Sequence, residues 1–161
     1  MKNLRIIFQW KCEGGKAMFL LTYDIYMSEE KMKEILPQAQ IKMRCLLKGY
    51  RLKFVKIYEN IVLKLLKSDL DMCVPAVIWN IKESELTDIE KIYSTESYDK
   101  FYFHITTENT DIVTVAYIPK NTVTMFPTNE YIEDIIKAYE EQNFDFCCIE
   151  YALDNVEQER R

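Results

Sequence analysis

Residues 74–81 read Val-Pro-Ala-Val-Ile-Trp-Asn-Ile. Branched and aromatic side chains of this kind favour a buried β-strand. Pro75 lacks the backbone N–H that a ladder uses, so it indicates the start of the strand or an edge position. A helix is predicted directly after the strand, because apolar residues recur at helical spacing over 86–93 and Ser84 can cap that helix. The rest of the fold prediction extends outward from this strand–helix unit.

More strands are predicted on both sides of the unit. They cover residues 18–23, 46–58 (interrupted at Gly49), 61–66, 101–107 and 112–118. Short apolar or alternating runs that end in Gly, Asn, Asp or Ser are typical of strands. The last two runs are separated only by the polar residues 108–111, which indicates a turn between paired strands.

Two further helices are predicted from caps and apolar spacing. Ser28 precedes two glutamates that suit a first helical turn, and Pro37 ends that helix. Pro127 leads into an amphipathic segment over 131–139. The charged residues 154–161 are expected to form a frayed tail. Strands with singly inserted helices indicate the α+β class, with a curved sheet or small mixed β-barrel flanked by helices.

The composition is that of one globular domain. The chain has 161 residues, and 48% hydrophobic with 29% charged residues argues against disorder. No apolar run approaches the roughly 20 residues of a membrane-spanning helix. We therefore expect a cytoplasmic protein with no membrane partner. The net charge of −5 argues against nucleic-acid binding, and the oligomeric state stays open.

The potential metal ligands are too few and too scattered for a zinc site. The chain has one histidine, and its five cysteines (Cys12, Cys45, Cys73, Cys147 and Cys148) include no Cys-x-x-Cys pair. Cysteines in apolar surroundings usually pack as small hydrophobic side chains. We expect no metal and no cofactor.

Residues 1–17 do not continue clearly into the pattern that follows, and two hypotheses explain them. The codons for Glu13-Gly14-Gly15 can spell a purine-rich ribosome-binding site, so that translation starts at Met18 and residues 1–17 are leader sequence. Alternatively, the chain starts at Met1 and residues 4–10 form an extra strand. Under either hypothesis the domain itself is expected over residues 18–153.

Four stretches, in order, resemble the gamma-glutamylcyclotransferase-like family. Residues 47–54 (LKGYRLKF) are similar to its "GYRLxF" strand, and 74–86 are similar to "VxGVLWxI" followed by "EL". Residues 116–118 (AYI) are similar to "AxxYV", and 127–140 are similar to the closing "PSxxYxxxIxxGAxE" helix. The resemblance extends over most of the chain and implies the small mixed β-barrel of that family.

The resemblance also implies a chemistry. Enzymes of the family release 5-oxoproline from gamma-glutamyl compounds, as the substrate's α-amine attacks its own side-chain amide. This reaction needs a carboxylate that moves a proton and backbone donors that hold the substrate. The family takes those donors from a "YGSN" loop after its first strand. The matching residues here are Tyr23, Asp24, Ile25 and Tyr26, which the resemblance assigns to substrate binding.

The loop keeps its tyrosine but has lost its glycine. Glycine lets a backbone approach a ligand closely, whereas Asp24 has a side chain in the way. The carboxylate of Asp24 would also repel a substrate carboxylate. We therefore predict poor binding of the family's usual substrate. The alternative for Asp24 is an ordinary turn residue at the surface.

The catalytic carboxylate of the family, in a "YEGY" segment, has two matching positions. Without a gap the position falls on Tyr93, which cannot act as a carboxylate base. With three extra residues, about one helical turn, it falls on Glu96. We favour Glu96 as general acid and base, against the alternative that it is one of several solvated glutamates. With the same three extra residues, the resemblance assigns Tyr102 to the substrate site, and His104 stands where the family has an arginine.

The aromatic and histidine side chains have structural explanations as well. Tyr98, Tyr102, Tyr117 and Tyr131 could line a pocket, although aromatic residues inside a barrel usually belong to the core. A single histidine in an alternating strand, such as His104, is usually structural.

Two functions remain. The first is a cyclotransferase-like enzyme that acts on a small gamma-glutamyl or related substrate with Glu96. The second is a non-catalytic module that keeps the fold and binds a small ligand or a protein. No Cys-His or Ser-His spacing indicates an enzyme of the nucleophilic type.

Overall fold

A computed structural model describes residues 11–12 and 15–159, with side chains from Ala17 onward. Strand β1 (Lys11–Cys12) pairs with β2 (Gly15–Thr22), so β2 begins ahead of Met18. The predicted strand over 4–10 lies outside the described residues, as do Glu13 and Gly14.

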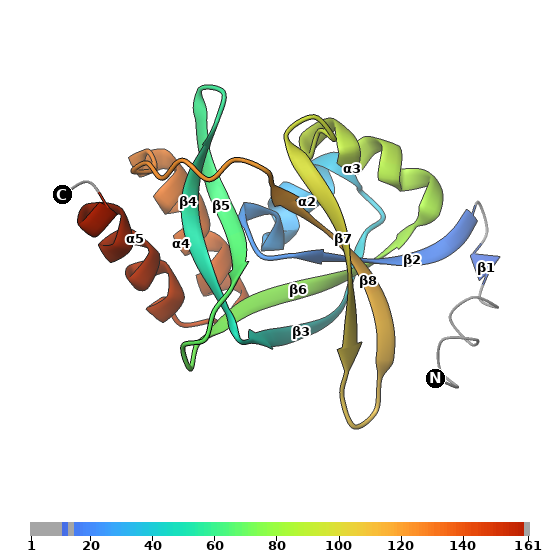
Figure 1. Cartoon of the computed structure of the whole chain (residues 1–161). Helices are drawn as coiled ribbons and strands as arrows, with labels where there is room; N and C mark the ends of the chain where they lie inside the picture. Colours follow the sequence, from blue (N-terminus) through green and yellow to red (C-terminus); the bar gives the residue numbers. More distant parts are fainter. Residues whose placement is uncertain (1–10, 13–14, 160–161) are drawn as a thin grey trace.

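Two sheets build the molecule (Figure 1). The larger has the order β3-β6-β2-β8-β7, with β1 paired to β2, and the smaller is the hairpin β4-β5. The strands after β2 are β3 (Gln40–Lys48), β4 (Tyr50–Ile57), β5 (Asn60–Lys67), β6 (Cys73–Lys82), β7 (Tyr98–Thr106) and β8 (Asp111–Pro119). All pairs are antiparallel except β2 and β8, which meet in parallel at Leu20 and Val115.

The larger sheet is curled but does not close, so the expected barrel is open. Gly49 connects β3 to β4 in the left-handed conformation, with φ of +80°, which glycine adopts without steric cost. After this bend β4 pairs with β5 and does not extend the larger sheet. The two edge strands, β3 and β7, share no ladder. Closure fails because the strands that could bridge those edges pair with each other.

The strand predicted over 74–81 lies inside the larger sheet. Its ladder with β3 starts at Cys73, but its ladder with β2 covers only Val77 to Lys82. Pro75 lies beyond the end of β2, so its missing N–H leaves the β2–β6 ladder intact. The prediction of an edge-like position for Pro75 holds locally. Trp79 of this strand is fully buried, and its Nε1 donates to Thr22 Oγ1 at 2.9 Å.

Four α-helices are present in the described chain, one more than the three predicted. They are α2 (Glu29–Ile35), α3 (Leu86–Ile92), α4 (Asn129–Gln142) and α5 (Cys147–Glu159), with 3₁₀ turns η1 (Ile25–Met27) and η2 (Glu83–Glu85). Ser28 caps α2 as predicted, since its hydroxyl accepts from the Lys31 N–H. The prediction for Ser84 is wrong. It lies within η2, whose first N–H, at Lys82, donates to the Glu85 carboxylate at 2.8 Å.

Helix α5 replaces the expected frayed tail. Residues 154–159 continue the helix, which packs against β4 and lies beside α4 at one end of the molecule (Figure 1). Ile149, Ala152 and Val156 follow helical spacing and are buried. Lys53 of β4 also forms an ion pair with Glu159, at 3.7 Å. Burial of this face gives the charged segment a fixed structure.

Candidate functional site

A pocket of about 510 Å³ lies where four parts of the chain meet. They are the loop after β2 (24–26), the tip of the β4–β5 hairpin (57–62), the segment from the end of α3 to the start of β7 (92–98), and the start of α4. Three of the four loop residues expected to bind substrate, Asp24, Ile25 and Tyr26, line this pocket. The fourth, Tyr23, is buried and donates through its hydroxyl to the Tyr117 carbonyl oxygen at 2.9 Å.

Asp24 is the half-buried carboxylate of the pocket. One oxygen, Oδ1, accepts from the Tyr26 N–H at 3.0 Å, and Oδ2 accepts from the Tyr93 hydroxyl at 2.8 Å. Burial raises the pKa of Asp24, and these two hydrogen bonds limit the rise because they stabilise the ionised form. Among the described ion pairs, none includes Asp24. Within the described part of the chain, its charge therefore has hydrogen-bond donors but no cationic partner.

Four tyrosines surround this carboxylate on the pocket wall: Tyr26, Tyr93, Tyr98 and Tyr131. Burial and the charge of Asp24 together raise the pKa of all four phenols, which keeps them protonated at neutral pH. The rings of Tyr26 and Tyr98 stand nearly perpendicular to that of Tyr93, at centroid distances of 5.9 and 5.1 Å. Tyr117 stacks on the other side of Tyr93 at 5.3 Å. The carboxylate thus lies in a nearly neutral, aromatic environment.

Three backbone N–H groups in and directly after the loop donate to acceptors within the loop. The Tyr26 N–H donates to the Asp24 side chain, the Met27 N–H donates to the Asp24 carbonyl oxygen at 3.0 Å, and the Ser28 N–H donates to the Ile25 carbonyl oxygen at 3.1 Å. This pattern forms the turn η1, for which Asp24 is the N-cap residue. A side chain at position 24 therefore accepts a donor that a glycine would leave available.

Glu96 lies outside the pocket. It is exposed and lines a neighbouring hollow of about 350 Å³ together with Lys56 and Lys120. The two cavities share Ile57, Tyr58 and Ser97 as walls. Tyr93, the position obtained without a gap, is the residue that the fold brings against Asp24. The assignment of Glu96 as general acid and base remains a prediction.

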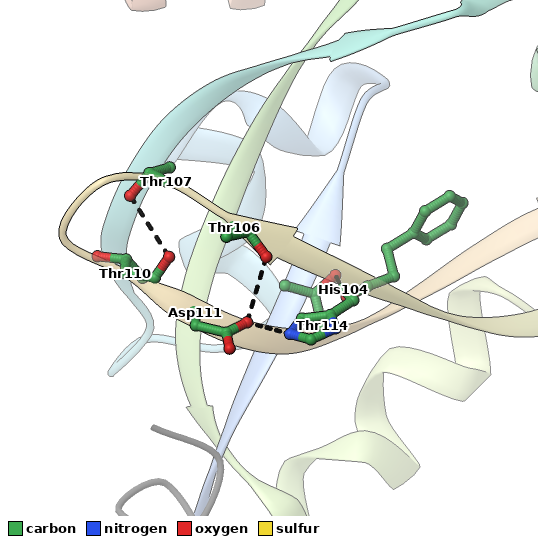
Figure 2. Close-up of polar contacts among 7 residues, drawn as sticks. His104, Thr106, Thr107, Thr110, Asp111 and Thr114 are labelled. Carbon is green, nitrogen blue, oxygen red and sulfur yellow. Dashed lines mark hydrogen bonds and ion pairs between the residues drawn. The ribbon is translucent and has the colours of Figure 1, made fainter. Parts of the chain in front are cut away.

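Tyr102 and His104 also lie away from the pocket. Tyr102 is 65% exposed, and both residues line a third hollow, of about 610 Å³, between β5 and β7. Near the end of the β7–β8 hairpin, His104 contacts the Asp111 carboxylate, which also accepts from Thr106 Oγ1 at 3.3 Å (Figure 2). His104 is thus part of a polar cluster that joins two strands, in line with its structural explanation.

Sequence reasoning missed most of the aromatic wall. Tyr98 and Tyr131, for which the sequence left pocket and core both open and favoured the core, line the pocket, and Tyr117 is buried as expected. The hairpin tip at 57–62 carried no signal of its own, because its place in the pocket depends on long-range packing. The ungapped match at Tyr93 was the available clue.

The remaining titratable side chains do not form a metal centre in the described residues. No group of three or more His, Cys, Asp or Glu side chains there is arranged to hold a metal ion. Cys148 is buried as predicted, and burial raises the pKa of its thiol to about 11, whereas Cys147 is exposed. Among the described helices, none has the length and apolar character needed to cross a membrane.

No family model matches the sequence, and no curated protein matches it. Solved structures do match in three dimensions. A gamma-glutamyl cyclotransferase has a TM-score of 0.71 at 16% identity, over 88% of this chain and 86% of its own. An uncharacterized protein from Homo sapiens has a TM-score of 0.70 at 17% identity, over 88% of this chain and 86% of its own. YkqA from Bacillus subtilis has a TM-score of 0.67 at 16% identity, over 80% of this chain and 50% of its own.

The chain therefore has the gamma-glutamyl cyclotransferase-like fold, which confirms the architecture that the four sequence stretches implied. Identities this low establish the fold alone. The function has to be argued from the pocket.

Proposed function

We propose that the chain is a small-ligand-binding protein on the gamma-glutamyl cyclotransferase-like fold, which holds its ligand in the Asp24 pocket and does not release 5-oxoproline. The observation that carries the proposal is the position of the Asp24 carboxylate. It accepts the Tyr26 N–H, a loop donor that the family resemblance would give to a substrate, and it accepts the hydroxyl of Tyr93, which stands at the ungapped catalytic position.

Electrostatics argue in the same direction. A gamma-glutamyl substrate carries an α-carboxylate, and no Lys, Arg or His is among the described residues that line the pocket. Two carboxylates about 4 Å apart repel each other by about 4 kcal/mol at an effective dielectric constant of about 20. That cost is comparable to the whole binding energy of a weakly bound metabolite. The family's substrate would bind poorly here.

Proton transfer would also lack its usual group. At the ungapped catalytic position stands Tyr93, and burial, together with the charge and hydrogen bond of Asp24, raises the pKa of its phenol. Such a phenol stays protonated and cannot accept a proton at neutral pH. Both requirements of the family's reaction, donors for the substrate and a free carboxylate, are therefore changed at this site.

The test is an assay of 5-oxoproline after incubation with gamma-glutamyl dipeptides and gamma-glutamyl amines. We expect no product above the level of a heat-inactivated control. Formation of 5-oxoproline by the wild-type protein, lost in Asp24→Asn, would contradict the proposal because it would make this pocket a cyclotransferase site.

A second candidate is 5-oxoproline release with Glu96 as general acid and base. The observation in its favour is that the hollow beside Glu96 shares Ile57, Tyr58 and Ser97 with the pocket, so one elongated ligand could contact both. In the same assay, product formed by the wild type but not by Glu96→Gln would support this candidate. Equal product from both proteins, or none from either, would exclude it.

A further inference from the structure

Both charged residues on the pocket wall are acidic. Asp24 and Glu59 contribute carboxylates, while the described lining residues include no cationic side chain. A low-dielectric cavity lined by charge of one sign attracts ligands of the opposite sign. The pocket is therefore suited to a positively charged ligand and unsuited to an anion.

Asp24 has capacity for a further donor. A carboxylate offers about four lone-pair sites, and the hydrogen bonds from Tyr26 and Tyr93 use one on each oxygen. The described residues give this half-buried charge no counter-ion, which is unfavourable, and a bound ammonium group would supply one. The carboxylate is thus a binding point for an N–H-bearing cation.

The tyrosine rings suit the same group. Tyr26 and Tyr98 stand edge to face against Tyr93, whose hydroxyl contacts Asp24, and all three rings line the pocket. A cation within about 6 Å of such ring faces is stabilised by their quadrupoles. An anion would gain nothing from these faces. Aromatic walls around one carboxylate are typical of sites that select ammonium groups.

The rest of the wall is largely hydrocarbon. It includes Ile25, Ile57, Ile61, Val62 and Ile92. Binding sites that combine apolar walls with a few polar groups favour ligands with the same division. A ligand with a charged end at Asp24 and an alkyl or aryl part along these side chains would match both regions.

We infer that the pocket binds a protonated organic amine, with its ammonium group on Asp24 between the tyrosine rings and its hydrocarbon part against the isoleucines. The inference rests on the proposed function and specifies the chemical class of the ligand.

The test compares three probes of equal chain length: hexylamine, 1-hexanol and hexanoate. Binding is followed by NMR shifts of the Tyr26, Tyr93 and Tyr98 ring signals during titration. We expect hexylamine to shift these signals, with 1-hexanol at least about tenfold weaker, since one charge-assisted hydrogen bond corresponds to such a factor. Hexanoate should produce no shift.

Variants separate charge from shape. Asp24→Asn keeps the side-chain size and should weaken hexylamine about tenfold or more. Tyr98→Leu removes one ring and should also weaken it. Asp154→Asn removes the same charge from an exposed site on α5, and should leave binding unchanged.

Equal binding of hexylamine and 1-hexanol, or full binding by Asp24→Asn, would overturn the inference and still leave a ligand pocket, so the proposed function would stand. Absence of any hexylamine shift would overturn it as well. The proposed function itself fails only in the 5-oxoproline assay, which the three probes do not affect.

Discussion

Asp24 carries an electrostatic cost in the folded protein. Burial raises its pKa, so the folded protein binds this proton more tightly than the unfolded chain does. Its contribution to stability is fully present below the unfolded-state pKa and is lost as pH rises through the folded-state pKa. At neutral pH the carboxylate is therefore less favourable than a neutral isostere would be. A residue kept at such a cost is consistent with a binding role.

A substitution of Asp24 by a residue that cannot ionise tests this electrostatic cost. Asp24→Asn cannot ionise. Its one oxygen can still accept the Tyr26 N–H, and its NH2 group, which takes the place of Oδ2, can donate to the hydroxyl oxygen of Tyr93. We expect it to be more stable than the wild type at neutral pH, with the difference shrinking as pH falls and the wild-type carboxyl becomes protonated. Thermal unfolding of both proteins between about pH 3 and about pH 8 measures the difference.

Asp154→Asn is the matched control because Asp154 is exposed, and it should follow the wild type at every pH. A constant difference between Asp24→Asn and the wild type across this range would contradict the electrostatic explanation. It would point to packing or hydrogen-bond geometry instead.

The sequence predicted the change at Asp24 in the loop, but it did not predict that Tyr93 is the hydrogen-bond partner of Asp24. Asp24 could be compared directly with the glycine of the family pattern. Tyr93 could not be connected to it, because their hydrogen bond joins residues far apart in the chain. The sequence match was also ambiguous by one helical turn, and local patterns do not distinguish such alternatives. The contacts of Tyr93, directly after α3, with Asp24 and Tyr26 resolve which residue faces Asp24.

Among the elements, α5 is the one with a testable energetic role. Val156 is fully buried on its inner face. Val156→Ala removes two methyl groups and leaves a small cavity, which should lower the free energy of unfolding by about 2 kcal/mol. Glu157→Ala changes the exposed neighbour and should alter it by less than about 0.5 kcal/mol. Urea denaturation of the two variants gives both values.

Equal stability of the Val156 variant and the wild type would mean that this end of α5 does not pack on β4. A frayed tail, as the charge of residues 154–161 first suggested, would give that result.

The difference between predicted and missed elements has a physical origin. Strand pairs such as β7 and β8 can be predicted because the alternation of apolar and polar residues and the polar turn between the strands are local features of the sequence. Helix α5 buries Cys148, Ile149, Ala152 and Val156. These buried side chains are mostly small, and acidic residues lie between them in the sequence. Such a face has little intrinsic hydrophobicity and is defined by the strand it packs on. The predicted cap at Ser84 failed because the turn η2 precedes α3, so that Ser84 lies inside this turn and Glu85 is the N-cap residue of the helix.

For the whole molecule, the two sheets share one core. Leu52 and Phe54 of β4 belong to the same buried cluster as Leu20 of β2 and Trp79 of β6. An isolated two-stranded sheet is marginal in water, so the β4–β5 hairpin should depend on the larger sheet. We expect the slowest-exchanging amides of β5 and β6 to report the same free energy of opening in native-state hydrogen exchange. Amides at the exposed tip 107–110 should exchange through smaller openings.

A free energy for β5 clearly below that for β6 would show that the hairpin unfolds by itself. In that case the pocket, which includes the hairpin tip, would open without global unfolding.

The overall architecture was predictable, and its closure was not. Four ordered stretches identified the strands and helices of this fold, and the solved structures confirm that arrangement. Whether the sheet closes depends on how edge strands meet across the molecule, which no single stretch encodes. The bend at Gly49, which redirects β4, was visible only as an interruption of a predicted strand.

The central place of β2 has a consequence for how the chain is made. The pocket loop follows directly after this strand. Its partners in the larger sheet, β6 and β8, lie far later in the sequence. Non-local pairing of this kind slows folding, and an apolar strand that awaits its partners is exposed to aggregation. During translation, Phe19, Leu20 and Leu21 leave the ribosome well before the residues that will cover them. The segment that positions Asp24 is thus synthesised before β6 and β8 and can be enclosed only after they emerge.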